Sequence, residues 1–384
     1  MRLLEPRMAA KWAEGVYTAT NRLAFMAFIN SNKEFSRLES DSKHLAATVG
    51  SRLINVQSNF AVCVRGAGHW QNDVFLIFRG THIKIDWVAN FRPGVKISAG
   101  GNMVHTGFHH IFTSMTHQLA AFMGKQTEAT TVHCIGHSLG GAVASLCAEW
   151  VKVNYGKQVK LYTFGAPRVS YGPGFASTLE TRLLPENIFR VYQVNDPVPM
   201  LPVFPFMHSP LMGKSYCLGA SGGLVTSKSH SMGANTKNIG YVAKVSKAAT
   251  WGELYQPAPV LSKASVEAWL SGDYDDNPNS MNFWNRFNSA FMYLVQGALG
   301  VVMPFATGAV TIADQLAMIL QKGLTVLGET SNWAFLLIKK MMRALGMRVA
   351  ETIEEITYQL IRMVLDRLLR IIANHVQRAL DTLR

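Results

Sequence analysis

The stretch TVHCIGHSLGG, residues 131–141, joins a strand-like run to a helix-like run and decides the fold of this chain. Residues 131–135 are rich in β-branched and apolar side chains, and residues 141–153 repeat apolar side chains at helical spacing. In a G-x-S-x-G turn between strand and helix, the glycines let the backbone bend tightly enough to hold a strained serine with its Oγ above the sheet edge. The pattern predicts Ser138 as a nucleophile, and its alternative is a glycine-rich turn without chemistry.

A second segment, residues 73–81, is placed to supply a hydrogen-bond donor for the oxyanion that a nucleophilic serine would form. The apolar strand candidate 73–78 runs directly into Arg79-Gly80-Thr81. Ester hydrolysis develops an oxyanion that needs two fixed N–H donors, usually one from the residue after the nucleophile and one from an earlier strand-to-helix loop. Leu139 and Thr81 occupy those two places, so we predict that they form the oxyanion hole.

Five blocks of the sequence, taken together and in this order, resemble the class 3 lipases. They are FRGT (78–81), VHTGF (104–108), GHSLGG (136–141), FGAPRV (164–169) and NDPVPMLP (195–202). The resemblance covers about residues 70–245. It implies an α/β-hydrolase fold, a Ser-Asp-His triad, and an oxyanion hole completed by the backbone N–H and the hydroxyl of Thr81.

The acid of the triad follows from the order of the chain. In this architecture the serine comes first, then the acid, then the histidine, because acid and base stand on loops after later strands. Residues 188–194 form the best strand candidate after Ser138 and end at Asn195-Asp196-Pro197. We predict Asp196 as the acid, although an Asp-Pro turn would explain it too. Later carboxylates break the chain order, because they follow the candidate histidine: Asp273, Asp275 and Asp276.

Three histidines follow Asp196, and one of them must be the base. His375 lies on a long helical pattern, where a helix-face histidine is the ordinary interpretation. His208 corresponds, by resemblance, to a histidine that follows the family's acid but is not the base. His230 resembles the histidine of the family's terminal H-x-M segment. We therefore predict that His230 takes the Ser138 proton while Asp196 holds its imidazole, with His208 as the second choice.

Two apolar segments beside these positions predict how a lipid would bind. Residues 82–91 stand where the family has its lid, and an ordinary surface helix is the alternative. The loop after Asp196 is dense in apolar side chains, which suits an acyl-binding wall, although core packing explains it almost as well. The lid candidates are Ile83, Ile85, Trp87, Val88 and Phe91, and the acyl-binding candidates are Val198, Leu201, Val203 and Phe204.

Composition limits the partners. A chain of 384 residues with 48% hydrophobic and 16% charged residues can build a large core and two domains. Its formal charge of +13 predicts an acidic partner. The basic residues are dispersed and no nucleic-acid motif is recognised, so we expect no nucleic acid and favour an anionic phospholipid surface.

The cysteines and the N-terminus bear on cofactors and location. The four cysteines show no metal-ligand spacing, so we expect no disulfide framework, no metal and no cofactor. Charges within residues 2–14 interrupt the apolar stretch that a signal peptide needs, which predicts synthesis in the cytoplasm without a Sec signal. A helix over about residues 8–29 is expected there instead.

The C-terminal third differs in character. We expect an α/β-hydrolase domain over 1–272, a linker over 273–280 and a helical region over 281–384. The linker carboxylates suit turns better than calcium. The run 287–313 carries no charge, so it could span a bilayer, insert reversibly or form buried helices. The amphipathic stretch 353–383 would pack on the rest of the tail or lie in a membrane interface.

Together these features predict a serine esterase acting on lipid esters at membranes, with a phospholipase A preferred. A triacylglycerol lipase is the nearest alternative, and a membrane-inserting or helix-assembling protein is the alternative from another class. The tail and the N-terminus resemble bacterial lipases delivered by specialised secretion, such as type VI antibacterial phospholipase effectors. That resemblance implies a toxin whose partners include an inhibitor (immunity) protein or a secretion component.

Overall fold

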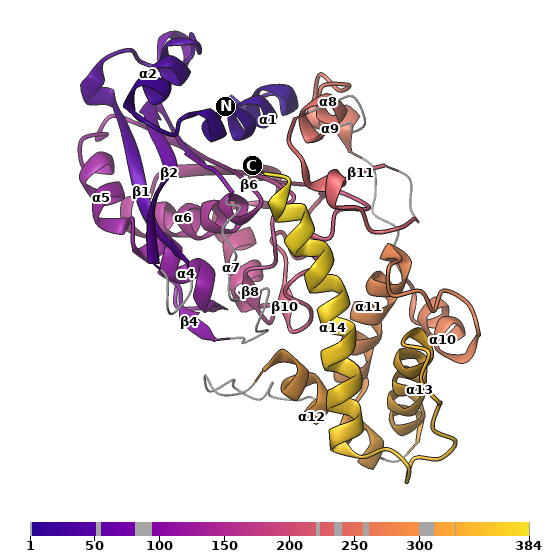
Figure 1. Cartoon of the computed structure of the whole chain (residues 1–384). Helices are drawn as coiled ribbons and strands as arrows, with labels where there is room; N and C mark the ends of the chain where they lie inside the picture. The colour runs from indigo at the N-terminus through magenta and orange to yellow at the C-terminus, as the bar shows by residue number, and fades with distance from the viewer. Residues whose placement is uncertain are drawn as a thin grey trace.

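The computed structural model describes most of the chain. The described residues are 2–50, 55–80, 94–219, 223–233, 240–255, 261–298, 311–326 and 328–383. The residues up to 255 hold the β-sheets and are called the sheet part below. Residues 261–383 are called the helical part, and Figure 1 shows its helices gathered on one side of the molecule.

The main sheet is of the mixed α/β type. Within the described residues it has seven strands in the spatial order β1-β2-β3-β6-β7-β9-β11. β2 pairs antiparallel with β1 and β3, and from β3 onward all neighbours are parallel. This confirms the predicted α/β-hydrolase fold class. The strands are β1 (Ser42–Gly50), β2 (Asn55–Arg65), β3 (Asp73–Phe78), β6 (Thr131–His137), β7 (Gln158–Phe164), β9 (Ile188–Gln193) and β11 (Ser215–Leu218).

A smaller sheet lies beside the main one. Its strands follow the order β10-β8-β5-β4 among the described residues. They are β4 (Val95–Ile97), β5 (Met103–His105), β8 (Ser170–Tyr171) and β10 (Phe206–Met207). The β8–β10 pairing ties the loop after FGAPRV to the loop that follows Asp196.

Helices cover both faces of the main sheet, and β3 shows the consequence. Val74, Leu76 and Phe78 enter the core under one set of helices, whereas Phe75 and Ile77 enter the core under the other. A strand buried on both faces has a continuous apolar sequence, as residues 73–78 do. One set is α4 (Thr106–Thr113), α5 (Thr116–Met123), α6 (Leu139–Tyr155) and α7 (Gly174–Leu183), and the other includes α1 (Pro6–Gly15), α2 (Arg22–Asn30), α8 (Tyr241–Val245) and α9 (Trp251–Leu254).

The N-terminal helix expected over 8–29 is wrong as a single element. The chain forms α1, a 3-10 turn η1 (Val16–Thr18) and then α2. The Asn21 side chain accepts a hydrogen bond from the backbone N–H of Ala24 at 2.9 Å and so caps a new helix. The break between the two helices brings Tyr17 of η1 to the carboxyl end of β3, beside Gly80.

The helical part is a set of amphipathic helices. They are α10 (Lys263–Ser271), α11 (Met281–Ala298), α12 (Ile312–Thr325), α13 (Glu329–Ala344) and α14 (Tyr358–Asp381). The predicted amphipathic stretch forms α14, and its apolar side chains, such as Val364, Leu368 and Ile372, are buried in the packing against α12 and α13. Two outcomes were predicted for this stretch, and in the structure it packs on the rest of the tail.

The helical part and the sheet part share one hydrophobic core. Phe204 of the sheet part stacks on Phe291 of α11 with ring centroids 6.2 Å apart. The uncharged run 287–313 falls on the end of α11 and the start of α12, while 299–310 lie outside the described residues. In the described part of the chain, no helix combines the length and the apolarity needed to cross a bilayer.

The predicted linker is held by ion pairs. Asp275 pairs with Arg286 of α11, while Asp273 pairs with Arg343 and Asp276 with Lys340, both on α13. Its carboxylates thus neutralise cations of the helical part. The domain boundaries at 272 and 281 stay a prediction.

Candidate active site

Ser138 stands in a strained turn between β6 and α6. Its φ of 57° and ψ of −132° lie outside the regions that side chains favour. A Cβ at Gly136 would overlap the Gly140 carbonyl oxygen, and a Cβ at Gly140 would overlap the carbonyl oxygen of Phe78. The two glycines of the motif are therefore steric requirements of the turn, as expected for a nucleophile elbow.

The structure brings together the three predicted triad residues. His230 Nε2 lies 2.7 Å from Ser138 Oγ, and His230 Nδ1 lies 2.8 Å from Asp196 Oδ2. All three residues are buried. The carboxylate can only accept, so Nδ1–H donates to Asp196 and leaves Nε2 free to accept the hydroxyl proton of Ser138.

The Asp196 carboxylate has several donors besides the imidazole. Tyr241 OH donates to Oδ2 at 2.7 Å, and Val198 N–H donates to Oδ1 at 2.9 Å. Burial and the neighbouring Asp196 charge hold the pKa of Tyr241 well above its usual value, so its phenol stays a donor. Gln193 N–H donates to the same phenol oxygen at 3.0 Å, which fixes Tyr241 in place.

A second set of hydrogen bonds supports the site from behind. His137 Nε2–H donates to the carbonyl of His230 at 2.9 Å, and Tyr17 OH donates to His137 Nδ1 at 2.7 Å. Tyr17 OH accepts in turn from Gly80 N–H at 2.8 Å. Burial first, then the proximity of His230, keep the pKa of His137 well below its usual value. This neutral histidine therefore holds the backbone position of His230.

Sequence reasoning missed Tyr17 and gave Tyr241 no role. Tyr17 precedes the motif region, and nothing in its neighbourhood marks it. Tyr241 carried a signal that could have been used, because a buried carboxylate needs donors beyond one imidazole, and Tyr241 closely follows His230 in the sequence.

The loop that carries His230 is tied to the helical part. It includes η6 (Ser227–His230), which packs against α14. Val225 N–H donates to the Asn279 carbonyl at 2.8 Å, and Met281 N–H donates to the Gly223 carbonyl at 3.1 Å. The loop that positions the imidazole is thus bonded to residues within and after the predicted linker.

Some of the other predicted site residues lie in the described part of the structure, and some lie outside it. Leu139 is the first residue of α6, where a helix N–H lacks an intrahelical acceptor, and it follows Ser138 directly. His208 Nε2–H donates to the Pro199 carbonyl at 2.8 Å, and His375 Nε2 meets the Asn279 side chain at 2.8 Å. Outside the described residues lie Thr81 and the lid candidates Ile83, Ile85, Trp87, Val88 and Phe91.

The acyl-binding candidates are core residues. Each has an exposed fraction of 4% or less: Val198, Leu201, Val203 and Phe204. They belong to the core shared by the two parts of the molecule. An acyl-binding role for them stays a prediction.

The fold and the Ser138 elbow define an α/β-hydrolase with a hydrogen-bonded serine, histidine and carboxylate. Residues 75–206 match the family model of "Lipase (class 3)". This part of the chain is therefore similar to the class 3 lipases.

Similar proteins carry related descriptions. The chain is 34% identical over 179 residues to the secreted mono- and diacylglycerol lipase 1 of Fusarium solani, covering 45% of this chain and 51% of that protein. It is 31% identical over 122 residues to phospholipase A(1) DAD1, chloroplastic, of Arabidopsis thaliana, covering 26% and 27%. It is 36% identical over 106 residues to toxin TseL of Vibrio cholerae, covering 27% and 15%. The matched region thus spans about half, or less, of the length of these relatives.

Proposed function

We propose that this protein is a serine esterase that hydrolyses carboxylic esters of lipids. One observation carries the proposal: the hydrogen bonds of 2.7 Å and 2.8 Å that run from Ser138 through His230 to Asp196 at a strained turn. The class 3 lipase match over residues 75–206 supports it. No cofactor is needed, because a triad supplies both the nucleophile and the proton transfers.

The proposed reaction has two stages. His230 takes the Ser138 proton as Oγ attacks the ester carbonyl, and the oxyanion is held by the backbone N–H groups of Leu139 and Thr81. His230 then protonates the leaving alcohol, and an acyl-enzyme forms. A water molecule, deprotonated by His230, attacks this intermediate and releases the fatty acid. Asp196 keeps the imidazole in the required tautomer throughout.

Phospholipid is the substrate class we favour. The formal charge of +13 suits an anionic membrane surface, and one relative is described as a phospholipase A(1). A triacylglycerol lipase is the second candidate, favoured by the description of the Fusarium relative. Purified protein incubated with defined phospholipid or triacylglycerol vesicles, followed by mass spectrometry, tests both. We expect lysophospholipid and fatty acid, and diacylglycerol as the main product would favour the second candidate.

The biological role we propose is that of a toxin delivered to a target membrane. The similarity to toxin TseL over 106 residues supports this role. A specialised secretion system and an inhibitor protein would be its partners. Expression directed to the periplasm of a bacterium should be toxic, and Ser138→Ala should remove the toxicity. Toxicity that survives this change would favour the membrane-inserting alternative.

A further inference from the structure

A cavity lies where the sheet part meets the helical part. Its volume is about 460 Å³. Cationic and polar side chains line it from both sides: Arg168, Arg190 and His208 from the sheet part, and Asn282, Arg286 and Asn288 from α11. A cavity of this size accommodates a small organic ligand.

Two of the cations in this cavity, Arg168 and Arg190, have no carboxylate partner among the described residues. No Asp or Glu lines it. In the part of the chain that the structure describes, neither Arg168 nor Arg190 forms an ion pair. Arg168 donates to neutral acceptors, the Asn288 side chain at 3.0 Å and the Pro202 carbonyl at 3.4 Å. Arg190 lies over the Tyr192 ring, 4.3 Å from its centroid.

Arg286 adds a third guanidinium to the lining. It pairs with Asp275 through Nη1, but its Nε is buried without a hydrogen-bond partner in the described structure. A buried donor without a partner is costly, and it is uncommon in native proteins. The cavity therefore combines unpaired charge with an unused donor.

The like charges oppose one another. Burial, followed by the repulsion of Arg190, lowers the pKa of Arg168 to about 9. Burial first, and then Arg190 and Arg168, hold the pKa of His208 well below its usual value. An anion in the cavity would relieve this repulsion, and buried charges are normally compensated in that way.

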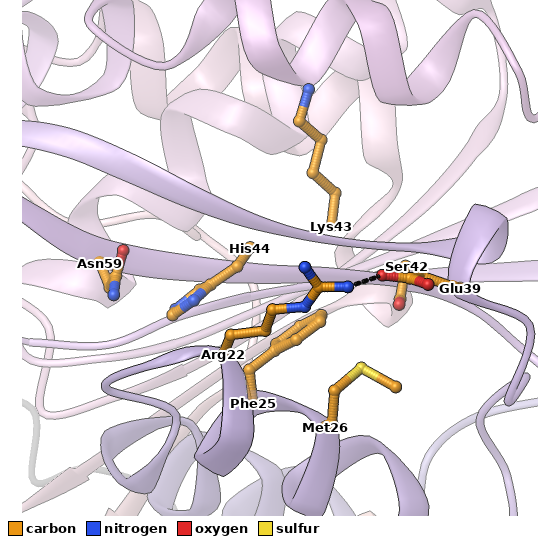
Figure 2. Close-up of a pocket in the computed structure, with 8 residues that line it drawn as sticks. All are labelled: Arg22, Phe25, Met26, Glu39, Ser42, Lys43, His44 and Asn59. Carbon is orange, nitrogen blue, oxygen red and sulfur yellow. Dashed lines mark hydrogen bonds and ion pairs between the residues drawn. The ribbon is translucent and has the colours of Figure 1, made fainter.

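Another cavity in the molecule shows the contrasting case. Figure 2 shows the cavity between α2 and the antiparallel edge of the main sheet, with a volume of about 410 Å³. Its Arg22 pairs with Glu39, and Phe25 stacks on His44 at a centroid distance of 5.1 Å. The charge of Arg22 is thus compensated by a carboxylate of the chain itself, unlike the charges of Arg168 and Arg190.

We propose that the cavity lined by Arg168, Arg190 and α11 is a binding site for a phosphate group. Guanidinium groups bind phosphate through paired, charge-assisted hydrogen bonds, and the side-chain amide of Asn282, which also lines the cavity, can donate to a remaining oxygen. The phosphate would come from a phospholipid head group or from free phosphate. Binding does not rest on the proposed hydrolysis, because no triad residue lines the cavity.

Calorimetric titration of the full chain tests the site. The probes are inorganic phosphate and glycerophosphocholine, a soluble phospholipid head group, at constant ionic strength, with and without Ser138→Ala. We expect binding to the wild type and to Ser138→Ala alike, and at least about tenfold weaker binding to Arg190→Gln. Tighter binding of glycerophosphocholine assigns the site to a lipid head group, and tighter binding of phosphate assigns it to the free anion.

Matched variants separate a binding role from a structural one. Arg22→Gln removes one exposed positive charge and should bind phosphate like the wild type. Without phosphate, Arg190→Gln should melt at the same temperature as the wild type or higher, because it removes repulsion, whereas a structural arginine would lower the midpoint. Arg190→Lys keeps the charge and should retain part of the affinity. Unchanged affinity in Arg190→Gln, or no binding of either probe by the wild type up to about 10 mM, would overturn the proposal.

Discussion

Two charged sites in this molecule, at Asp196 and at Arg190, have opposite surroundings. Asp196 accepts hydrogen bonds from His230, Tyr241 and the backbone N–H of Val198. Arg190, in the cavity beside α11, has an aromatic ring against it and no carboxylate among the described residues. The charge of Asp196 is stabilised by partners within the chain. The charge of Arg190 has no carboxylate partner, so a bound anion would stabilise it.

The largest expected effect is the loss of ester turnover when a residue of the predicted triad is replaced. Ser138→Ala and His230→Ala should each lower ester turnover by at least about 10⁴-fold while the thermal midpoint barely changes, because triad members act as a unit. His208→Ala is the matched control, and it should keep most of the esterase activity because His208 Nε2–H is bonded to the Pro199 carbonyl and not to the triad. Steady-state rates on a soluble short-chain ester measure this. Loss of turnover in His208→Ala with activity retained in His230→Ala would exchange the roles of the two histidines.

Removing the helical part should damage both sites. A chain ending at residue 280 loses Phe291 from the shared core, one wall of the cavity and the α14 contact with η6. Exposed apolar surface of that kind favours aggregation. We expect low soluble yield and loss of activity on soluble and vesicle substrates alike, measured by gel filtration and esterase assay. A monomer with full activity on the soluble ester would show that the triad needs nothing from the helical part.

Acid should destabilise the molecule through a histidine at each site. Burial lowers the pKa of His137 behind the triad and of His208 in the cavity, so both stay neutral when folded. The unfolded chain binds more protons below about pH 6.5, so stability falls as pH drops, by at most about 1.4 kcal/mol per pH unit for each group. Thermal midpoints between pH 7.5 and 5 measure this. Phosphate should reduce the loss in the wild type but not in His208→Ala.

A smaller effect is expected from Tyr241→Phe. The change removes one donor to Asp196 and one acceptor for Gln193 N–H. It should lower turnover by about tenfold, since a hydrogen bond to a charged group contributes about 1.5–3 kcal/mol. Tyr192→Phe, on β9 beside Arg190, is a control that leaves the triad untouched. Equal rates for the wild type and Tyr241→Phe would show that the carboxylate is sufficiently held by the remaining donors.

The sequence predicted the parts of the fold that depend on local pattern. The strand over 73–78, the turn at Ser138 and the order of Asp196 and His230 all follow from periodicity, glycine sterics and chain order. The single helix predicted over 8–29 was wrong because helical periodicity continues through this stretch and hides the cap at Asn21, where the second helix begins. The cavity could not be predicted, because Arg168, Arg190 and Arg286 meet only through the packing of α11 on the sheet part.

The attachment of the His230 loop to Asn279, Met281 and α14 also sets an order of assembly during synthesis. A ribosome makes Ser138 and Asp196 well before the segments that hold the imidazole in place. The nascent chain therefore lacks a fixed base until α14 has emerged and docked. For a protein proposed to attack membranes, we expect this timing to keep an unfinished chain inactive in the cell that makes it.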